Sequence, residues 1–362
     1  MKNIKTPLQK EANQFKNIRL FKGKISFLLD RRAMLIFTLL ALAAAALFVT
    51  STGLGEMKIS PITVIATFFG GGTEMDRLIV TSFRLPRIII ALVVGMGLAV
   101  AGGILQGMIR NPLASPDILG ITGGASVAVV GFLAIFSDEN NALTVPIAWM
   151  PVAAFIGAAL AAFLVYILAW KNGVSPIRLV LIGIGLMALM KALTTLMMIL
   201  GPIFQASQAN IWLTGTVYGS NWANVSIAVP ATLILIALAL IAARNLNIQE
   251  LGDDVATGLG SRVQKQRLAL LTIATGLIGT SVAFAGGIGF VGLMAPHMAR
   301  RLVGSSFGAL LPVSAVLGGI LVMAADLIGR TMFSPLEVPA GVFTAAIGAP
   351  YFIYLLFKTR NQ

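Results

Sequence analysis

Few side chains in this chain of 362 residues could carry acid–base, nucleophilic or metal chemistry. Cysteine is absent and His297 is the single histidine, so the sequence lacks thiolate ligands and the pair of imidazoles typical of a metal cluster. Carboxylates do not occur in pairs within the long apolar stretches, so the usual groups for general acid–base catalysis are missing too. We therefore expect no catalytic residues, no metal ligands and no cofactor.

The charged residues that stand out are arginines beside long apolar stretches. Arg84 and Arg87 bracket an R-L-P-R segment, and Arg330 follows another apolar stretch. A guanidinium group can bind a carboxylate through two parallel hydrogen bonds, so these arginines could dock an acidic partner. Arginines that flank membrane spans are also often interfacial anchors. Arg330 could instead pair with Asp326, one turn earlier on the same helix.

The elements that must position these residues are membrane helices. Hydrophobic residues make up 57% of the chain, charged residues make up 11%, and the mean hydropathy is +0.93. Such values indicate an all-α polytopic membrane protein. A transmembrane helix needs roughly 17 to 25 mainly apolar residues. The segments that qualify are 34–53, 88–109, 118–136, 147–170, 177–200, 225–243, 267–288, 309–328 and 340–357.

The charge distribution predicts the topology. Residues 1–32 hold nine Lys or Arg against two acids, which places the N-terminus in the cytoplasm by the positive-inside rule. Lys358 and Arg360 place the C-terminal tail there too. A cleaved signal peptide is the alternative for the first span, but the leader is long and its removal would leave the wrong number of crossings.

Two cytoplasmic ends require an even number of crossings. Because nine segments qualify by hydropathy, the chain must cross the membrane once more in a segment that hydropathy does not detect. Arg300 and Arg301 should lie inside, which makes the chain recross between about 289 and 303. That segment is too short for a hydrocarbon core of about 30 Å. We expect a short buried helix after irregular, glycine-rich backbone that is shielded from lipid. The prediction is ten crossings.

A short polar segment follows the sixth span on the predicted cytoplasmic side. Within residues 250–260, Leu251, Val255 and Leu259 recur at helical spacing on one face. Asp253 and Asp254 would lie in the first turn, where carboxylates favour the helix dipole. Such a helix could dock into a groove on a partner or lie on the membrane surface, and the pattern alone does not separate these alternatives.

Several of these segments form a recurrent set. The motifs are Arg84-Leu85-Pro86-Arg87, Asn111-Pro112-Leu113-Ala114 with Pro116, Leu119-Gly120 and Gly124-Ala125, Leu251-Gly252 with Ala256 and Leu259-Gly260, Gly289-Phe290-Val291-Gly292-Leu293 with Pro296-His297, and Ala325-Asp326. In this order, from about residue 34 to 357, the chain resembles the FecCD-type permeases, the membrane subunits of ABC importers for iron-siderophores, haem and vitamin B12. Residues 1–33, a basic cytoplasmic extension, lie outside the resemblance.

The resemblance implies a vitamin B12 importer permease-like fold in the bacterial cell membrane, multi-pass, with both termini cytoplasmic. It implies a second permease subunit, identical or paralogous, two ATP-hydrolysing subunits and an extracytoplasmic substrate-binding protein, and no nucleic acid. No G-x-x-x-x-G-K-[ST] loop occurs, so ATP binding is expected on another polypeptide. The implied ATPase-coupling helix comprises Glu250, Leu251, Gly252, Asp253, Asp254, Val255, Ala256, Leu259 and Gly260. The implied docking residues for the binding protein are Arg84, Arg87 and Arg330.

Other residues are candidates for the pathway. Lys191 lies near the middle of a span, where a lipid-facing charge would cost about 2.5–3.5 kcal/mol, so it lines a cavity, pairs structurally or snorkels. Gly287 and Gly289 flank the predicted reversal and are candidate gate residues. His297 is expected to pack and hydrogen-bond. Helix-packing G-x-x-x-G spacings occur at Gly103 with Gly107 and at Gly215 with Gly219.

The predicted domains are the 1–33 extension, the 34–357 permease domain and the 358–362 tail. The favoured ligand is an iron(III)-siderophore, with haem and cobalamin behind it. An ion-coupled secondary transporter is the alternative, but it would normally place acids near the midplane. Asp326, near the outer end of its span, is the single acid that we expect within a span.

Overall fold

The computed structural model describes residues 15–20, 25–55, 57–138, 142–201 and 203–359. Parts of the predicted 1–33 extension and 358–362 tail, Arg360 included, lie outside the described residues. Strands β1 (Phe15–Leu20) and β2 (Ile25–Asp30) pair as an antiparallel hairpin. The rest of the described chain folds as a helical membrane domain, as the sequence predicts.

The helices follow in chain order. They are α2 (Arg31–Gly53), α3 (Pro61–Phe68), α4 (Glu74–Leu78), the π-helical η2 (Ile79–Arg84), α5 (Leu85–Ile109), η3 (Asp117–Leu119), α6 (Ile121–Ile135), η4 (Ile147–Trp149), α7 (Met150–Ala169), α8 (Pro176–Leu200), α9 (Ile203–Thr214), α10 (Trp222–Glu250), α11 (Asp253–Gly258), α12 (Val263–Ala285), α13 (Val291–Val303), α14 (Phe307–Thr331) and α15 (Ala340–Thr359).

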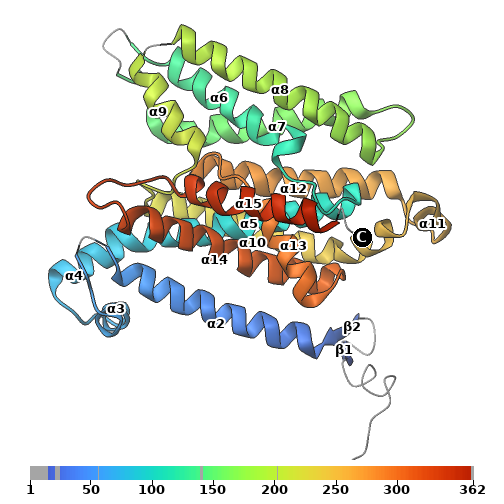
Figure 1. Cartoon of the computed structure of the whole chain (residues 1–362), viewed down its shortest axis with the longest axis horizontal. Coiled ribbons are helices and arrows are strands. Elements are labelled where there is room, and N and C mark those ends of the chain that lie inside the picture. The colour runs from blue at the N-terminus through green and yellow to red at the C-terminus, as the bar shows by residue number, and fades with distance from the viewer. Residues whose placement is uncertain (1–14, 21–24, 56, 139–141, 202, 360–362) are drawn as a thin grey trace, which may run out of the picture.

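Among the described residues, nine apolar helices match the nine predicted apolar spans. Seven helices are long and apolar enough to span a membrane, and α6 and α15 are shorter apolar helices. The predicted short helix is present as α13, which has 13 residues and follows the glycine-rich segment. That it makes a tenth crossing stays a prediction. In Figure 1, α6 to α9 form an upper layer, α5, α10 and α12 to α15 the middle, and α2 the lower edge. Helix α11, β2 and the end of α15 lie at one end of the bundle, which we call the α11 end. Helices α3 and α4 lie at the opposite end, which we call the α4 end.

Helix α5 is the central element. Of its most apolar stretch, 83% is buried inside the chain, against 28% for α8 and for α10. Glycines allow its backbone to touch its neighbours, since a Cβ on Gly102 would lie 1.7 Å from the carbonyl oxygen of Gly292 in α13. Gly103 and Gly107 contact α14, so that predicted close packing is confirmed. The other predicted spacing is wrong, because Gly215 and Gly219 lie in a turn after α9 with positive φ.

The segment between α5 and α6 turns back into the bundle. A Cβ on Gly292 would lie 2.8 Å from Pro116 and 2.9 Å from the carbonyl oxygen of Leu98. Since Leu98 precedes the end of α5 by eleven residues, Pro116 lies about 16 Å inside that end. Helix α6 therefore starts within the bundle and has only 15 residues, about 22 Å. The predicted span 118–136 is thus too long, because its first part is not α-helical.

Candidate functional site

The predicted coupling segment is a short helix at the α11 end. Helix α11 covers Asp253–Gly258, so it is shorter than the predicted 250–260. Glu250 is the last residue of α10, and Leu251 and Gly252 connect the two helices. Gly252 has φ 106°, a conformation that a glycine adopts readily, and this allows the chain to turn sharply from α10 into α11.

Ion pairs fix α11 to the core helices. The Asp253 carboxylate pairs with Arg110 just beyond α5 at 2.6 Å and with Arg267 of α12 at 3.0 Å. The Arg267 side chain is only 1% exposed. One turn before α11, Glu250 pairs with Arg300 of α13 at 3.0 Å. The position of α11 is therefore tied through carboxylate–guanidinium contacts to three helices that cross the bundle.

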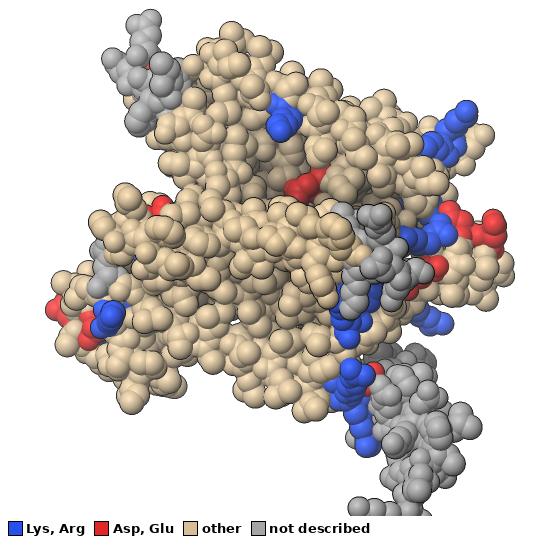
Figure 2. Space-filling model, viewed as in Figure 1, with Lys and Arg blue, Asp and Glu red and all other residues tan. Residues whose placement is uncertain are grey.

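One face of this segment is apolar and uncovered. Leu251, Val255 and Leu259 are 61%, 51% and 64% exposed, while Ala256 is buried against the bundle. In Figure 2 most visible charged side chains lie at the two ends of the molecule, and the surface between them is largely uncharged. The row of three lies at one of these polar ends rather than within the uncharged belt. The row is therefore open to a partner protein or to the membrane surface.

Two of the predicted docking arginines hold the end of α2. Arg84 donates hydrogen bonds to the carbonyl oxygens of Thr52, Gly53 and Met57 at 2.9, 3.0 and 2.6 Å. These carbonyls lie at and just beyond the last turn of α2, where they lack helical partners. Arg330 adds hydrogen bonds to the same turn, donating to the Ser51 and Leu54 carbonyls.

The third arginine joins two carboxylates. Arg87 pairs with Asp326 at 2.8 Å and with Glu337 at 2.9 Å, and its guanidinium lies 5.6 Å from the Tyr218 ring centre. Asp326 also lies 3.4 Å from Arg330, so the predicted pairing within α14 is confirmed. The acid lies between two cations in a buried network that links α5 to α14.

The structure brings the three arginines together. Arg84, Arg87 and Arg330 line one cavity of about 570 Å³ at the α4 end. Arg84 and Arg87 are half-buried, whereas Arg330 is buried with 8% of its surface exposed. In this conformation all three guanidinium groups already have partners within the chain, so an incoming carboxylate would compete with these contacts.

The candidate gate residues lie at the reversal between α12 and α13. Gly286 has φ 66°, and a Cβ there would lie 2.0 Å from the Trp212 carbonyl oxygen, so this position requires a glycine. Gly287 bonds through its amide to that carbonyl. Gly289 has open space around it. The reversal is therefore packed against the end of α9.

Two other predicted residues lie apart from this reversal. Lys191 is exposed on α8, and no ion pair involves it among the described residues. His297 packs edge-to-face against Tyr351, with ring centres 5.9 Å apart. Its expected hydrogen bonds do not form, because neither ring nitrogen has a partner in the described part of the chain.

Asp117 is a polar residue that the sequence analysis missed. It lies in η3, directly after Pro116 in the segment that turns back into the bundle, and it is half-buried. The hydroxyl of Thr122, in the first turn of α6, is its hydrogen-bond partner. The signal was present in the sequence, since prolines between two apolar stretches favour irregular backbone inside a membrane protein.

Comparison with known proteins gives a consistent result. The FecCD transport family model matches residues 41–358. The chain is 58% identical to the probable siderophore transport system permease protein YfhA of Bacillus subtilis, covering 92% of this chain and 97% of that protein. It is 40% identical to the Fe(3+) dicitrate transport system permease protein FecD of Escherichia coli, covering 91% and 99%. A solved inward-facing metal-chelate type ABC transporter superposes with TM-score 0.78 and 28% identity, covering 90% and 99%.

Proposed function

Since this chain belongs to the FecCD transport family, we propose that it is the permease subunit of an ABC importer that carries an iron(III)-siderophore, or a related ferric chelate, into the cytoplasm. A separate subunit hydrolyses the ATP that drives transport. The observation that carries this proposal is α11, whose apolar face is uncovered while its base is held by ion pairs to the core helices. The ferric substrate is supported by the names of the relatives.

In this proposal the α11 end is cytoplasmic. The loops and helix ends that lie there hold Arg110, Lys171, Arg178 and Arg262, in keeping with the positive-inside rule. An ATPase subunit binds the row of Leu251, Val255 and Leu259. When the ATPase subunits close on nucleotide, they displace α11. The ion pairs of Asp253 and Glu250 transmit that displacement to α5, α12 and α13.

At the opposite end a loaded binding protein docks over the cavity that the arginines line. Arg84 and Arg87 receive its carboxylates. A second permease subunit, identical or paralogous, faces the recess that Figure 2 shows between the α6 to α9 layer and α15, and the path runs between the two subunits. Lys191 on α8, with Gly287 and Gly289 at the reversal, contributes to that path and its gate. The permease itself performs no covalent chemistry.

Asp117 is relevant to the alternative mechanism, an ion-coupled secondary transporter, because such a transporter requires a polar ion site inside the membrane. The segment around Asp117 meets the start of α13, and α6 starts just after it. Helix N-termini carry positive partial charge and favour anions, whereas transporters coordinate Na⁺ through unwound carbonyls and helix C-terminal ends. This arrangement therefore favours a structural role for Asp117 over a cation-coupling site.

The test is uptake into proteoliposomes. The permease is reconstituted with its ATPase and binding protein, and uptake of radiolabelled ferric hydroxamate and ferric citrate is measured. We expect uptake to require ATP on the α11 side and to be insensitive to collapse of the proton and sodium gradients. Uptake that follows an ion gradient without the ATPase would contradict the proposal.

Removing the docking charges provides a second test. In the double variant Arg84→Gln with Arg87→Gln, binding-protein-stimulated ATPase activity is expected to fall about tenfold or more, since charge pairs across an interface couple by at least about 1.5 kcal/mol. Arg77→Gln controls for the loss of an exposed charge at the same end. Because Arg84 and Arg87 also hold contacts within the chain, thermal unfolding of the double variant must show that its fold is intact. Stimulation that survives in the double variant as well as in the control would count against the docking role.

A further inference from the structure

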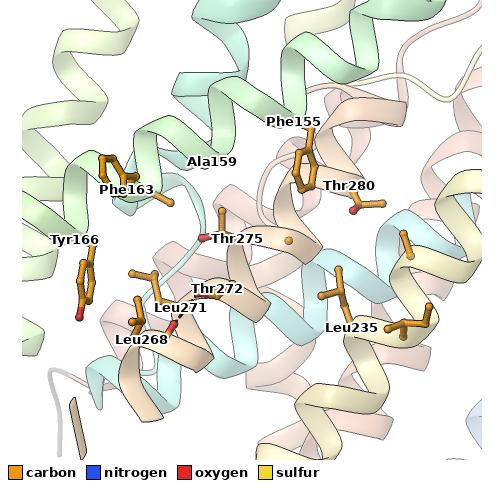
Figure 3. Close-up of a pocket in the computed structure, with 14 residues that line it drawn as sticks. Phe155, Ala159, Phe163, Tyr166, Leu235, Leu268, Leu271, Thr272, Thr275 and Thr280 are labelled. Carbon is orange, nitrogen blue, oxygen red and sulfur yellow. Dashed lines mark hydrogen bonds between the residues drawn. The ribbon is translucent and has the colours of Figure 1, made fainter. Parts of the chain in front are cut away.

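A long apolar groove lies between α7 and α10, with α12 as its floor. Its volume is about 580 Å³. Figure 3 shows Phe155, Phe163 and Tyr166 of α7 on one side, Leu235 of α10 on another, and a row of α12 residues from Leu268 to Thr280 along the base. The groove is separate from the arginine cavity and from α11, so nothing in the proposed transport cycle uses it.

The groove opens toward the lipid rather than toward water. Its lining includes exposed apolar side chains, among them Phe163 at 58%, Ile234 at 61% and Leu268 at 44%. The row from Leu268 to Thr280 spans thirteen residues of α12, about 18 Å. One leaflet contributes about 15 Å of the hydrocarbon core. The groove thus has the length and the polarity of a single acyl chain in the leaflet at the α11 end.

Basic side chains lie at the end of the groove where a headgroup would be. Lys265 precedes Leu268 by three residues and continues the same row on α12. Lys171 follows Trp170, whose ring stacks on Tyr166 with centres 5.6 Å apart. The turn after Lys171 packs on α12, because Gln264 accepts a hydrogen bond from the Val174 amide at 2.9 Å.

Both lysines are free to bind an anion. Their side chains are exposed, and neither forms an ion pair within the described ranges of the chain. Lysines at the membrane surface attract anionic lipid headgroups, and aromatic rings such as Tyr166 and Trp170 favour the headgroup level. The two lysines and the aromatic rings of Tyr166 and Trp170 thus lie at the end of the groove where the lipid headgroup would be.

We propose that the groove between α7 and α10 binds an anionic phospholipid of the leaflet at the α11 end. One acyl chain lies along the row from Leu268 to Thr280, and the phosphate contacts Lys265 and Lys171. The lipid fills a gap between helices that the chain's own side chains leave open. By bridging α7 and α12 it stabilises the upper layer against the core.

Lipid retention measures this directly. The assembled transporter is placed in nanodiscs that hold phosphatidylglycerol and phosphatidylcholine with identical acyl chains, and lipids that remain on the released complex are counted by native mass spectrometry. We expect phosphatidylglycerol to be retained in preference to phosphatidylcholine. Lys265→Gln should reduce that retention about fivefold, the effect of one basic side chain near the surface. Ala159→Phe, which fills the groove, should abolish it.

Matched controls separate the groove from the general surface. Arg244→Gln removes an exposed charge from the same end of α10, and Leu160→Phe enlarges an exposed α7 side chain that does not line the groove. Both should retain lipid as the unaltered transporter does. Equal retention of the two lipids, equal loss in variants and controls, or occupation of the groove by a protein segment in a crosslinking experiment would each overturn the proposal. If Ala159→Phe fails to assemble, Lys265→Gln still tests the proposal, because Lys265 is exposed and its substitution should leave assembly intact.

Discussion

Val255→Asp is expected to abolish assembly with the ATPase subunit and reduce transport to background. The substitution places a carboxylate in the centre of the apolar row formed with Leu251 and Leu259, where the partner would bury it without a counter-charge. A lost central contact of this kind costs about 2–4 kcal/mol, or roughly 30- to 1,000-fold in affinity. The measurement is co-purification of the ATPase with the permease, together with ATP-dependent uptake.

The control for this variant lies on the same helix. Thr257→Asp introduces the same charge two residues later, roughly 200° around the helix from Val255. Because Val255 is 51% exposed, its substitution should leave folding and membrane insertion intact, which thermal unfolding in detergent would show. Normal assembly of Val255→Asp, or equal damage from Thr257→Asp, would mean that the apolar row is not the contact surface.

The second large effect is expected at Asp326. Its side chain is 3% exposed and lies between Arg87 and Arg330, which are 14% and 6% exposed. Asp326→Ala leaves two buried guanidinium groups without their shared counter-charge. Breaking a buried ion pair from one side costs about 3–5 kcal/mol, so we expect a large fall in the thermal unfolding temperature of the purified permease.

A surface acid at the same end gives the comparison for Asp326. Glu74 is exposed in the first turn of α4, and Glu74→Ala should change stability by less than about 1 kcal/mol. Asp326→Asn should fall between the two, because its amide oxygen can still accept from Arg87. If Asp326→Ala unfolds at the same temperature as Glu74→Ala, the network at the α4 end does not hold the helices together.

The sequence predicts the membrane helices well, because hydropathy identifies segments that lipid surrounds and the positive-inside rule indicates on which side of the membrane a loop lies. The short buried helix within 289–303 follows from charge parity, and α13 lies there. The start of α6 is a different matter. Residues 111 to 117 are polar and proline-rich, so hydropathy predicts a surface loop. The segment from 111 to 120 instead turns back among α5, α8 and α13, and this depends on tertiary packing against Gly292 and Gly183.

Among the functional residues too, local patterns could be predicted and long-range contacts could not. The spacing of Leu251, Val255 and Leu259 is local, so the exposed row could be predicted. The partners of Arg84 and Arg330 are carbonyls at the end of α2, more than thirty residues away in the chain for Arg84, and nothing in the local pattern indicates them. Asp117 was missed because hydropathy treats the segment around it as a loop at the membrane surface.

The most direct measurement of the transport proposal uses the absence of cysteine from the native chain. A single Val255→Cys variant carries one thiol on the apolar row, and Ile62→Cys, at a position 81% exposed on α3, carries one at the opposite end. With a short thiol-specific crosslinker in membranes, Val255→Cys is expected to join the ATPase subunit and Ile62→Cys to react only with reagents added outside the cell. No crosslink from Val255→Cys to an ATPase, or labelling of both thiols from the same side, would contradict an importer driven through α11.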